Sequence, residues 1–314
     1  MKDALVTLIG GGGFLGRYVA QDLMKRGARI RVVQRRPRDA WFLKPLGGLG
    51  QSQFVAGDVT RLETMVNAIA GSDAVVNLAG TFKPGDYTAV HATGARNVAQ
   101  AAKAAGVSAL VQVSAIGADP QSRAGYARSK AAGEAAVREV FPNATIIRPS
   151  VLFGREDQFV NRFAGMIVRA SALPLGLMPV LRPEAQFQPA FVADAAEAVV
   201  AALADPKTHG GKTYEIGGPD VLTMAQIQRW IANEIGLAPT FVELPDPIGA
   251  LVPMLPATGI TGDQWKMLGY DNVVATDSAG LEALGVQPTP LATVAPGWLV
   301  QYRRHGRFTK PSAA

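Results

Sequence analysis

Residues 5–16 read LVTLIGGGGFLG, an apolar run that leads directly into a glycine-rich turn, and a helix-like stretch follows over Arg17–Met24. Gly10, Gly13 and Gly16 give the spacing G-x-x-G-x-x-G. In such a turn the first glycine permits the sharp reversal, the second lets the backbone approach a pyrophosphate, and the third lets the helix pack closely on the strand. N–H groups at the helix N-terminus then favour a diphosphate. The order of strand, glycine turn and helix therefore predicts a dinucleotide site rather than a merely flexible turn.

Apolar segments alternate with helical patterns through the first half of the chain. The expected strands are Leu5–Ile9, Ile30–Gln34, Gln53–Ala56, Ala74–Leu78, Ala109–Ser114 and Ala144–Arg148. The expected helices between them include Leu62–Ala70, Ala89–Ala105 and Tyr126–Val140. Strands that are apolar throughout suit a parallel sheet covered on both faces. The alternation predicts an α/β fold with a doubly wound parallel sheet of Rossmann type and a smaller C-terminal lobe.

The rhythm loosens after Pro149. Ser171–Leu181 is apolar but contains two prolines, so we expect a loop that fills the core, folds over a ligand or packs on a partner. Thr223 is expected to cap a helix over Met224–Ile235. Pro247–Pro256 is apolar but too short to cross a bilayer. We therefore place a nucleotide-binding core with interleaved substrate or partner elements at residues 1–236, and the lobe with a basic tail at residues 237–314.

Composition limits the classes of function. The 314 residues are 48% hydrophobic and 18% charged, which suits a large folded core. The absence of cysteine excludes disulfides and thiolate chemistry, and His91, His209 and His305 show no metal-ligand spacing, so no metal site is predicted. The first strand begins too early for a preceding signal peptide, and no apolar run reaches the ~18 residues of a membrane span. We expect a cytoplasmic protein.

Positive charge is unevenly distributed along the chain, whose net charge is +6. Between Lys25 and Lys44 there are eight basic residues and one acid, Asp39. The basic tail after Glu282 contains no acid but carries Arg303, Arg304, Arg307 and Lys310. No recognition motif or set of base-stacking aromatics accompanies these charges, so we expect no nucleic-acid partner. The tail is either an ordinary solvated surface or a docking site for an acidic partner or an anionic membrane, which would be the inner face of the cytoplasmic membrane.

The end of the second strand bears on the choice of cofactor. NAD-binding folds usually carry an acid there, hydrogen-bonded to the ribose 2′-hydroxyl, whereas this chain has Arg35 and Arg36. The planar guanidinium group suits a phosphate, so the pair favours NADP(H) over NAD(H); the alternative is that these are surface residues. Asp58, followed by Val59, is placed to hold the adenine amino group. Residues 77–80, which include Asn77, Ala79 and Gly80, are expected beside the adenine ribose.

A possible catalytic group follows the fifth strand. Ser114 ends that strand, and Tyr126 with Lys130 forms the pattern Y-x-x-x-K, whose spacing puts both side chains on one face of a helix. A phenol titrates near ~10, and an adjacent ammonium is expected to bring its pKa toward the working range. Lys130 could also hold the nicotinamide ribose. Ser114 could hydrogen-bond a substrate carbonyl that Tyr126 protonates as hydride arrives.

Together these motifs resemble the short-chain dehydrogenase/reductase superfamily, in its extended or atypical branch. Later segments, Arg148–Phe159, Pro189–Asp194 and Thr261–Val274, resemble the accessory nucleotide-binding subunit of mitochondrial respiratory complex I, so the similarity extends over nearly the whole chain. The chain looks like a bacterial member of that family, which also has relatives tied to coenzyme Q biosynthesis. The resemblance implies the following cofactor-binding residues: Gly10, Gly13, Phe14, Leu15, Gly16, Arg35, Arg36, Asp58, Val59, Asn77, Ala79, Gly80, Tyr126, Lys130 and Pro149.

Three functions stay open. The resemblance implies a tightly held NADPH that serves structure, in an accessory or assembly protein associated with respiratory complex I or with quinone-synthesis proteins. Ser114, Tyr126 and Lys130 are instead the residues of an active enzyme, and with the apolar Leu173–Leu181 segment they favour a free NADPH-dependent reductase of a hydrophobic carbonyl compound such as a quinone, sterol or isoprenoid. The third alternative is a regulator that senses NADP(H). We favour the first.

Overall fold

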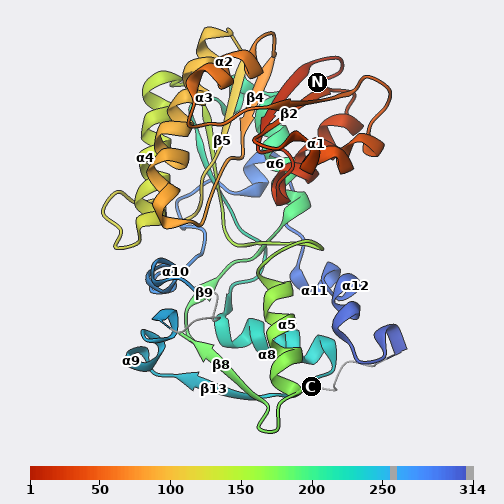
Figure 1. Cartoon of the computed structure of the whole chain (residues 1–314), viewed down its shortest axis with the longest axis vertical. Coiled ribbons are helices and arrows are strands. Elements are labelled where there is room, and N and C mark those ends of the chain that lie inside the picture. The colour runs from red at the N-terminus through yellow and green to blue at the C-terminus, as the bar shows by residue number, and fades with distance from the viewer. Residues whose placement is uncertain (255–259, 309–314) are drawn as a thin grey trace. The chain divides into compact units, whose positions relative to one another are not determined.

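The computed structural model describes residues 1–254 and 260–308, and they fold into two compact units. Unit 1 is built from residues 1–149, 192–216 and 275–287, and unit 2 takes the segments between and after them. The chain therefore passes back and forth between the units, as the colours of Figure 1 show. The boundary that the sequence predicts at residue 236 stays a prediction.

A seven-stranded parallel sheet forms the centre of unit 1, in the order β11-β6-β5-β4-β1-β2-β3. Its strands are β1 (Leu5–Ile9), β2 (Arg29–Gln34), β3 (Ser52–Ala56), β4 (Ala74–Asn77), β5 (Ala109–Val113), β6 (Thr145–Pro149) and β11 (Thr213–Ile216). The strand order reverses direction between β1 and β4, so the sheet is doubly wound and the predicted fold class is confirmed. The six predicted strands are present, and the edge strand β11 is an addition.

Helices cover both faces of this sheet (Figure 1). On one face α2 (Leu62–Ile69), α3 (Gly94–Ala104) and α4 (Gly125–Val140) pack side by side, and on the other α1 (Phe14–Lys25) packs on α6 (Val192–Ala204). The shorter elements of unit 1 are η1 (Pro37–Leu46), η2 (Pro84–Asp86), the π-helical turn η3 (Thr88–Thr93), α7 (Pro206–His209) and η5 (Leu281–Leu284). Because both faces are covered, β5 is buried along its whole length, which suits the apolar side chains at four of its five positions.

Unit 2 packs the helices α5 (Val160–Ser171) and α8 (Met224–Ile235) against short two-stranded sheets. The strand pairs are β7 (Leu152–Phe153) with β10 (Ala190–Phe191), β9 (Gln186–Phe187) with β12 (Leu222–Thr223), and β8 (Leu177–Leu181) with β13 (Thr240–Leu244). The short helices of unit 2 are α9 (Asp246–Gly249), η4 (Val252–Met254), α10 (Gly262–Met267), α11 (Leu291–Val294), α12 (Pro296–Leu299), η6 (Val300–Tyr302) and η7 (Gly306–Phe308). Phe153, Ile167, Val180 and Ile231 meet in its core.

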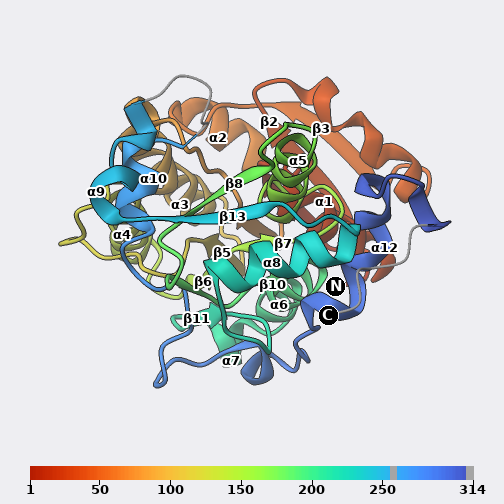
Figure 2. The ribbon, with the colours of Figure 1, turned by 90° about the horizontal axis from the view of Figure 1, so that it is seen from below.

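The prediction of a loop over Ser171–Leu181 is wrong for its second part. Leu177–Leu181 forms β8, which runs parallel to β13 (Figure 2). Met178 and Val180 point into the core, whereas Pro179 lies on the exposed side. The only strand paired with β8 among the described residues is β13. A proline is tolerated on such an edge strand, where its nitrogen need not donate to a ladder. Of the roles considered for this segment, filling the core fits β8, whereas Leu173 and Leu175 before it are exposed.

The helix cap predicted at Thr223 is confirmed. Thr223 Oγ1 accepts a hydrogen bond from the Gln226 N–H at 3.2 Å, and the Thr223 N–H donates to Gln226 Oε1 at 2.8 Å. These two bonds form a capping box that fixes the start of α8. Of the apolar segment Pro247–Pro256, the part up to residue 254 forms α9 and η4, and Pro256 lies outside the described residues. Within the described ranges, no helix has the length and apolar character that a membrane crossing needs.

The basic tail differs from the solvated run of charges that its composition suggests. Arg303 is built into unit 2, because its guanidinium donates to the Glu234 carbonyl oxygen at 2.7 Å and lies 3.4 Å from a Glu234 carboxylate oxygen. Arg304 is exposed. The side chain of Arg307 and all of Lys310 lie outside the described residues. The tail therefore offers fewer solvent-facing charges than its sequence implies.

Candidate functional site

The glycine turn joins β1 to α1 in a conformation that its glycines allow. Gly10 has φ +78°, a left-handed value that other residues rarely adopt. A Cβ atom on Gly16 would lie 2.6 Å from the Gly11 carbonyl oxygen, so a glycine is required where α1 starts close to the turn. Gly13 is the N-cap of α1, and no side chain in the described ranges caps that end. The N–H groups of Phe14 and Leu15 lie at the N-terminus of α1, where backbone donors can bind a diphosphate.

The carboxyl end of β2 lies beside this turn. Gln34, Arg35, Arg36 and Asp39 line a hollow of about 520 Å³, and both arginines are exposed. The Gln34 side chain donates to the Arg36 carbonyl oxygen at 2.7 Å, and a Cβ atom on Gly12 would collide with it. The predicted arginine pair is therefore adjacent to the glycine turn. Asp39, a carboxylate in the same hollow, is noted in the sequence only as the one acid of a basic segment, because it follows the strand end by several residues.

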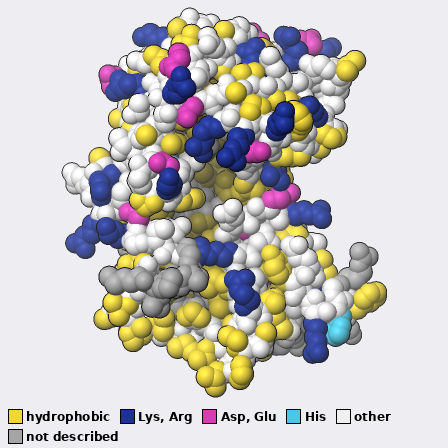
Figure 3. All heavy atoms as spheres, viewed as in Figure 1, with side chains coloured by type: hydrophobic (Ala, Val, Ile, Leu, Met, Phe, Trp, Pro, Cys, Tyr) yellow, Lys and Arg dark blue, Asp and Glu magenta, His cyan; other side chains and the backbone are white. Residues whose placement is uncertain are grey.

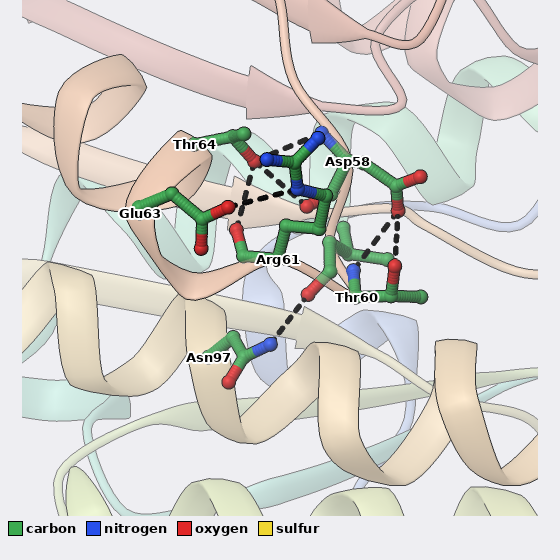
Figure 4. A network of polar contacts seen from close by, with 7 residues as sticks. Asp58, Thr60, Arg61, Glu63, Thr64 and Asn97 are labelled. Carbon is green, nitrogen blue, oxygen red and sulfur yellow. Dashed lines mark hydrogen bonds and ion pairs between the residues drawn. The ribbon is translucent and has the colours of Figure 1, made fainter.

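Asp58 belongs to a polar network that shapes the turn after β3 (Figure 4). Its Oδ1 accepts from the backbone N–H and the hydroxyl of Thr60, at 3.0 and 2.9 Å. The Thr60 N–H bond is the main reason that the pKa of Asp58 lies below its usual value, and the positive charge of Arg35 lowers it further. Asn97 on α3 donates to the Val59 carbonyl oxygen at 2.8 Å and ties the turn to the helix layer. Asp58 is thus an ionised acceptor near Arg35.

The turn after β4 packs against the glycine turn. A Cβ atom on Gly10 would lie 3.3 Å from the Leu78 carbonyl carbon. Asn77 is buried, where its amide donates to Gln112 Oε1 at 2.8 Å and its Oδ1 accepts from the Ala79 N–H at 3.1 Å. The Asn77 side chain therefore holds the turn rather than reaching into solvent. This arrangement places the backbone of residues 78–80 at the carboxyl edge of the sheet.

Ser114, Tyr126 and Lys130 come together at the end of β5. Lys130 Nζ donates to the Val113 carbonyl oxygen at 3.4 Å, next to Ser114, and lies 5.7 Å from the centre of the Tyr126 ring. A Cβ atom on Gly80 would lie 3.7 Å from the same Nζ. The Ser114 hydroxyl is buried and has no hydrogen-bond partner among the described residues. Burying such a group without a partner is costly, so this hydroxyl is suited to bond a ligand.

Burial sets the protonation of this group, and the expected lowering of the tyrosine pKa is wrong. Burial raises the pKa of Tyr126, and the neighbouring Tyr87 raises it further. Burial also lowers the pKa of Lys130 to about 8, although the negative charge of Glu134 acts in the opposite direction. A phenolate would lose its hydration at this buried position, and that loss decides the direction of the shift. Tyr126 is therefore a protonated hydroxyl at neutral pH.

Aromatic side chains that the sequence did not indicate surround Tyr126. The Phe82 ring stacks on it with centroids 4.9 Å apart and planes 16° apart, although Phe82 itself is 57% exposed. Tyr87 and His91 meet the ring edge-on, at 5.8 and 5.4 Å. The non-α turns η2 and η3 bring these residues together, so no regular spacing could have revealed them.

His91 fixes the segment after β4 onto α4. Its Nε2 accepts from the Thr81 N–H at 3.0 Å, so the ring proton lies on Nδ1, which donates to Ser129 Oγ at 2.8 Å. Ser129 Oγ in turn donates to the Tyr126 carbonyl oxygen at 2.7 Å. Burial, helped by the positive charge of Lys130, lowers the pKa of His91 to about 3. A neutral histidine thus links Thr81, next to the stacked Phe82, with the backbone of Tyr126.

Behind the site, ion pairs connect β6 with its neighbours. Arg148 contacts Glu134 on α4 at 2.7 Å and Glu215 on β11 at 3.3 Å, and both carboxylates are buried. The hydrogen bond from Arg148 to Glu134 is the main cause of its raised pKa. Pro149 ends β6, and its carbonyl oxygen accepts from the Ile116 N–H at 3.0 Å. These contacts position the end of β6 beside the segment that carries Ser114.

Known proteins share this fold and much of this sequence. The family described as NAD dependent epimerase/dehydratase matches residues 6–217. NADH dehydrogenase (ubiquinone) 1 alpha subcomplex subunit 9, mitochondrial, of Mus musculus is 36% identical over 304 residues, which cover 93% of this chain and 78% of that protein. Ceramide reductase of Caulobacter vibrioides is 32% identical over 255 residues, which cover 79% of this chain and 77% of that protein. The structure of an NADPH-dependent quinone oxidoreductase from Escherichia coli has a TM-score of 0.70 and 20% identity, covering 94% of this chain and 99% of that one.

Proposed function

The chain belongs to the NAD dependent epimerase/dehydratase family, and we propose that it binds NADP(H) along the carboxyl edge of the unit 1 sheet. The family membership confirms the resemblance that the sequence motifs indicated, and it implies a nicotinamide cofactor. The finer choice of NADP(H) is supported by Arg35 and Arg36, two exposed cations on one hollow beside the glycine turn. Asp39 on that hollow would repel a phosphate, but the two cations outnumber it.

The chain's own residues fit such a ligand. Gly13 and the start of α1 would hold the diphosphate, and Arg35 with Arg36 would hold the 2′-phosphate. Asp58, an ionised acceptor near Arg35, would meet the adenine. Lys130 would hold the nicotinamide ribose. The buried Ser114 hydroxyl, which has no hydrogen-bond partner among the described residues, would donate to such a ligand.

Two sets of variants, one in the glycine turn and one at the arginine pair, test the binding site. A Cβ atom on Gly13 would approach the Gly10 carbonyl oxygen at 3.2 Å, so Gly13→Val should fold while its side chain obstructs the diphosphate. We expect this variant to keep its far-ultraviolet circular dichroism and to lose NADPH binding in calorimetry. For cofactor choice, Arg35→Ala with Arg36→Ala should weaken NADPH binding by about 2–3 kcal/mol and leave NADH binding nearly unchanged. Arg123→Ala, another exposed arginine, is the control. Equal affinity of the unaltered protein for NADH and NADPH would contradict the proposal.

We further propose an accessory or assembly role associated with a respiratory NADH:quinone oxidoreductase, in which the bound nucleotide supports the structure. What carries this proposal is the similarity over 93% of the chain to a protein named as a subunit of NADH dehydrogenase (ubiquinone). The geometry of Tyr126 agrees with it, since its ring stacks on Phe82 and the residue is buried. A tagged full chain should copurify with NADH:quinone oxidoreductase activity from its own cells. Tyr126→Phe should leave that association intact, and Gly13→Val should weaken it.

A second candidate, a reductase of a hydrophobic carbonyl compound, is favoured by Ser114, Tyr126 and Lys130 and by the relative named as a ceramide reductase. In this reaction the nicotinamide, when bound, supplies the hydride. The Ser114 hydroxyl would donate a hydrogen bond to the carbonyl oxygen, and protonated Tyr126 would give it the proton that completes the alcohol. NADPH oxidation with a quinone or ceramide-like ketone that is lost in Tyr126→Phe would establish this role. Unchanged oxidation in that variant would exclude Tyr126 as the proton donor.

A further inference from the structure

Exposed hydrophobic side chains of unit 1 are concentrated on and just after η1. The described residues of unit 1 include seven large hydrophobic side chains that are exposed, and four of these lie between residues 41 and 49. They are Trp41 at 46%, Phe42 at 42%, Leu46 at 46% and Leu49 at 108% exposure. Single exposed apolar residues are ordinary, whereas a cluster on one short segment marks an interaction surface.

The same segment carries exposed cations that contact its aromatic rings. Lys44 Nζ lies 4.0 Å from the centre of the Trp41 ring, and the Arg38 guanidinium carbon lies 5.5 Å from it. On α1, the guanidinium carbon of Arg17 lies 4.6 Å from the centre of the Phe42 ring. Figure 3 shows basic side chains intermixed with hydrophobic ones over the part of unit 1 that contains α1. We call Trp41, Phe42, Leu46, Leu49, Arg38 and Lys44 the Trp41 surface.

The exposure of the Trp41 surface is built into the fold. Ala40 and Leu43 are fully buried, and they anchor η1 on the rest of unit 1. After η1, the Gln51 side chain donates to the Met24 and Ala28 carbonyl oxygens at 2.7 and 2.9 Å and accepts from the Gly48 N–H at 2.8 Å. Leu49 therefore projects from a turn that is held at its base by hydrogen bonds.

The chemistry of this surface matches an anionic bilayer. Tryptophan is enriched at the membrane–water interface, and exposed Lys and Arg are attracted to acidic headgroups. An acidic protein face would satisfy the cations but would need a pocket for each of four separate apolar side chains. We propose that the Trp41 surface docks on an anionic lipid bilayer, with Trp41, Phe42, Leu46 and Leu49 at the level of the headgroups. This surface shares no residue with the C-terminal basic tail or with the lining of the hollow beside Arg35 and Arg36.

Sedimentation of the full chain with vesicles tests the proposal. The protein should bind vesicles that contain phosphatidylglycerol, bind pure phosphatidylcholine vesicles weakly, and dissociate as salt is raised. Trp41→Ala with Phe42→Ala should lower the partition coefficient about tenfold or more, because the inserted area is lost. Leu173→Ala with Leu175→Ala, which removes two exposed leucines of unit 2, is the matched control and should bind normally. All these side chains are exposed, so the melting temperatures should agree.

Fluorescence gives a second readout that does not depend on affinity. Trp41 is exposed, whereas Trp230, Trp265 and Trp298 are half-buried. Emission should shift to the blue with phosphatidylglycerol vesicles and be quenched by brominated lipid, and Trp41→Phe should remove both signals while keeping sedimentation. The proposal is overturned if the unaltered protein ignores these vesicles, if the Trp41/Phe42 variant binds normally, or if the Leu173/Leu175 control loses binding instead. A change of oligomeric state in the Trp41/Phe42 variant, without vesicle binding by the unaltered protein, would identify a contact between copies and would also overturn it.

Discussion

Removing the buried ammonium of Lys130 should make the nucleotide-free protein more stable. The side chain is 7% exposed, and its pKa falls from 10.5 to about 8, chiefly through burial. A shift of that size corresponds to about 3 kcal/mol by which the folded state disfavours the charged form. The hydrogen bond that would be lost, to the Val113 carbonyl oxygen, is long at 3.4 Å. Lys130→Met keeps most of the apolar stem, so we expect a gain of about 2–3 kcal/mol in the free energy of unfolding at pH 7.

The gain should depend on pH in a defined direction. A base with a lowered pKa binds its proton more weakly in the folded state, so the destabilisation is complete below pH 8. It disappears as the pH rises from about 8 to 10.5, where the unfolded chain also loses the proton. Urea unfolding at pH 7 and at pH 10.5, without nucleotide, should show the gain of Lys130→Met at the first pH and little of it at the second. Lys103→Met, which alters an exposed lysine on α3, should change neither.

Adding NADPH at a saturating concentration should make the unaltered protein more stable than Lys130→Met. A ligand stabilises the folded state by mass action, so the unaltered protein should gain stability with NADPH while Lys130→Met, which lacks the ribose contact, should gain less. A variant that is less stable than the unaltered protein at pH 7 would refute the inference, and so would a gain that is equal at both pH values. The same lysine would then have to stabilise the fold in its charged form.

Three further predictions concern the frame of the site. Gly16→Ala should lower the free energy of unfolding by about 1–3 kcal/mol, because its Cβ would press on the turn at 2.6 Å; an unchanged melting curve would show that the turn adapts freely. The unaltered protein should lose stability as the pH falls from 6.5 toward 3, because the pKa of His91 is lowered in the folded state and the unfolded chain takes up the proton first. His91→Asn should flatten this part of the curve of unfolding free energy against pH, measured with urea. A curve of unchanged slope would exclude His91 as the source of the loss. Arg148→Met should cost about 3–5 kcal/mol in urea unfolding, since it leaves Glu134 and Glu215 buried without their cation; a cost below about 1 kcal/mol would mean that water or protonation compensates.

Much of unit 1 could be predicted because its signals are local. The glycine turn and the apolar strands each follow from a few adjacent residues, as does the cap at Thr223 in unit 2, and the structure confirms them. The strand β11 was missed because four residues, Thr213–Ile216, carry no recognisable pattern. β8 was taken for a loop because Pro179 reads as a breaker, and its position on an edge strand depends on a partner far along the chain.

The candidate site shows the same limit more sharply. The spacing of Tyr126 and Lys130 predicts that they share a helix face, and they do lie near one another. Their protonation depends on depth of burial, which spacing does not report, so the expected direction for the Tyr126 pKa was reversed. Phe82 and His91 were missed since they reach the site through turns without a helical or strand period.

The interleaving of the two units has a consequence for synthesis. Unit 1 is complete only when residues 275–287 have joined it, and Leu281 and Leu284 of that segment are buried there. A ribosome must therefore translate most of unit 2 before the nucleotide-binding unit can close its core. All strands of the sheet precede that segment, but the parts of α6 and β11 on which η5 packs stay uncovered for several seconds at ordinary elongation rates. Nascent chains should thus depend on chaperones that protect β-rich intermediates, and a fragment that stops at residue 236 should be insoluble even though it contains every residue assigned to the nucleotide.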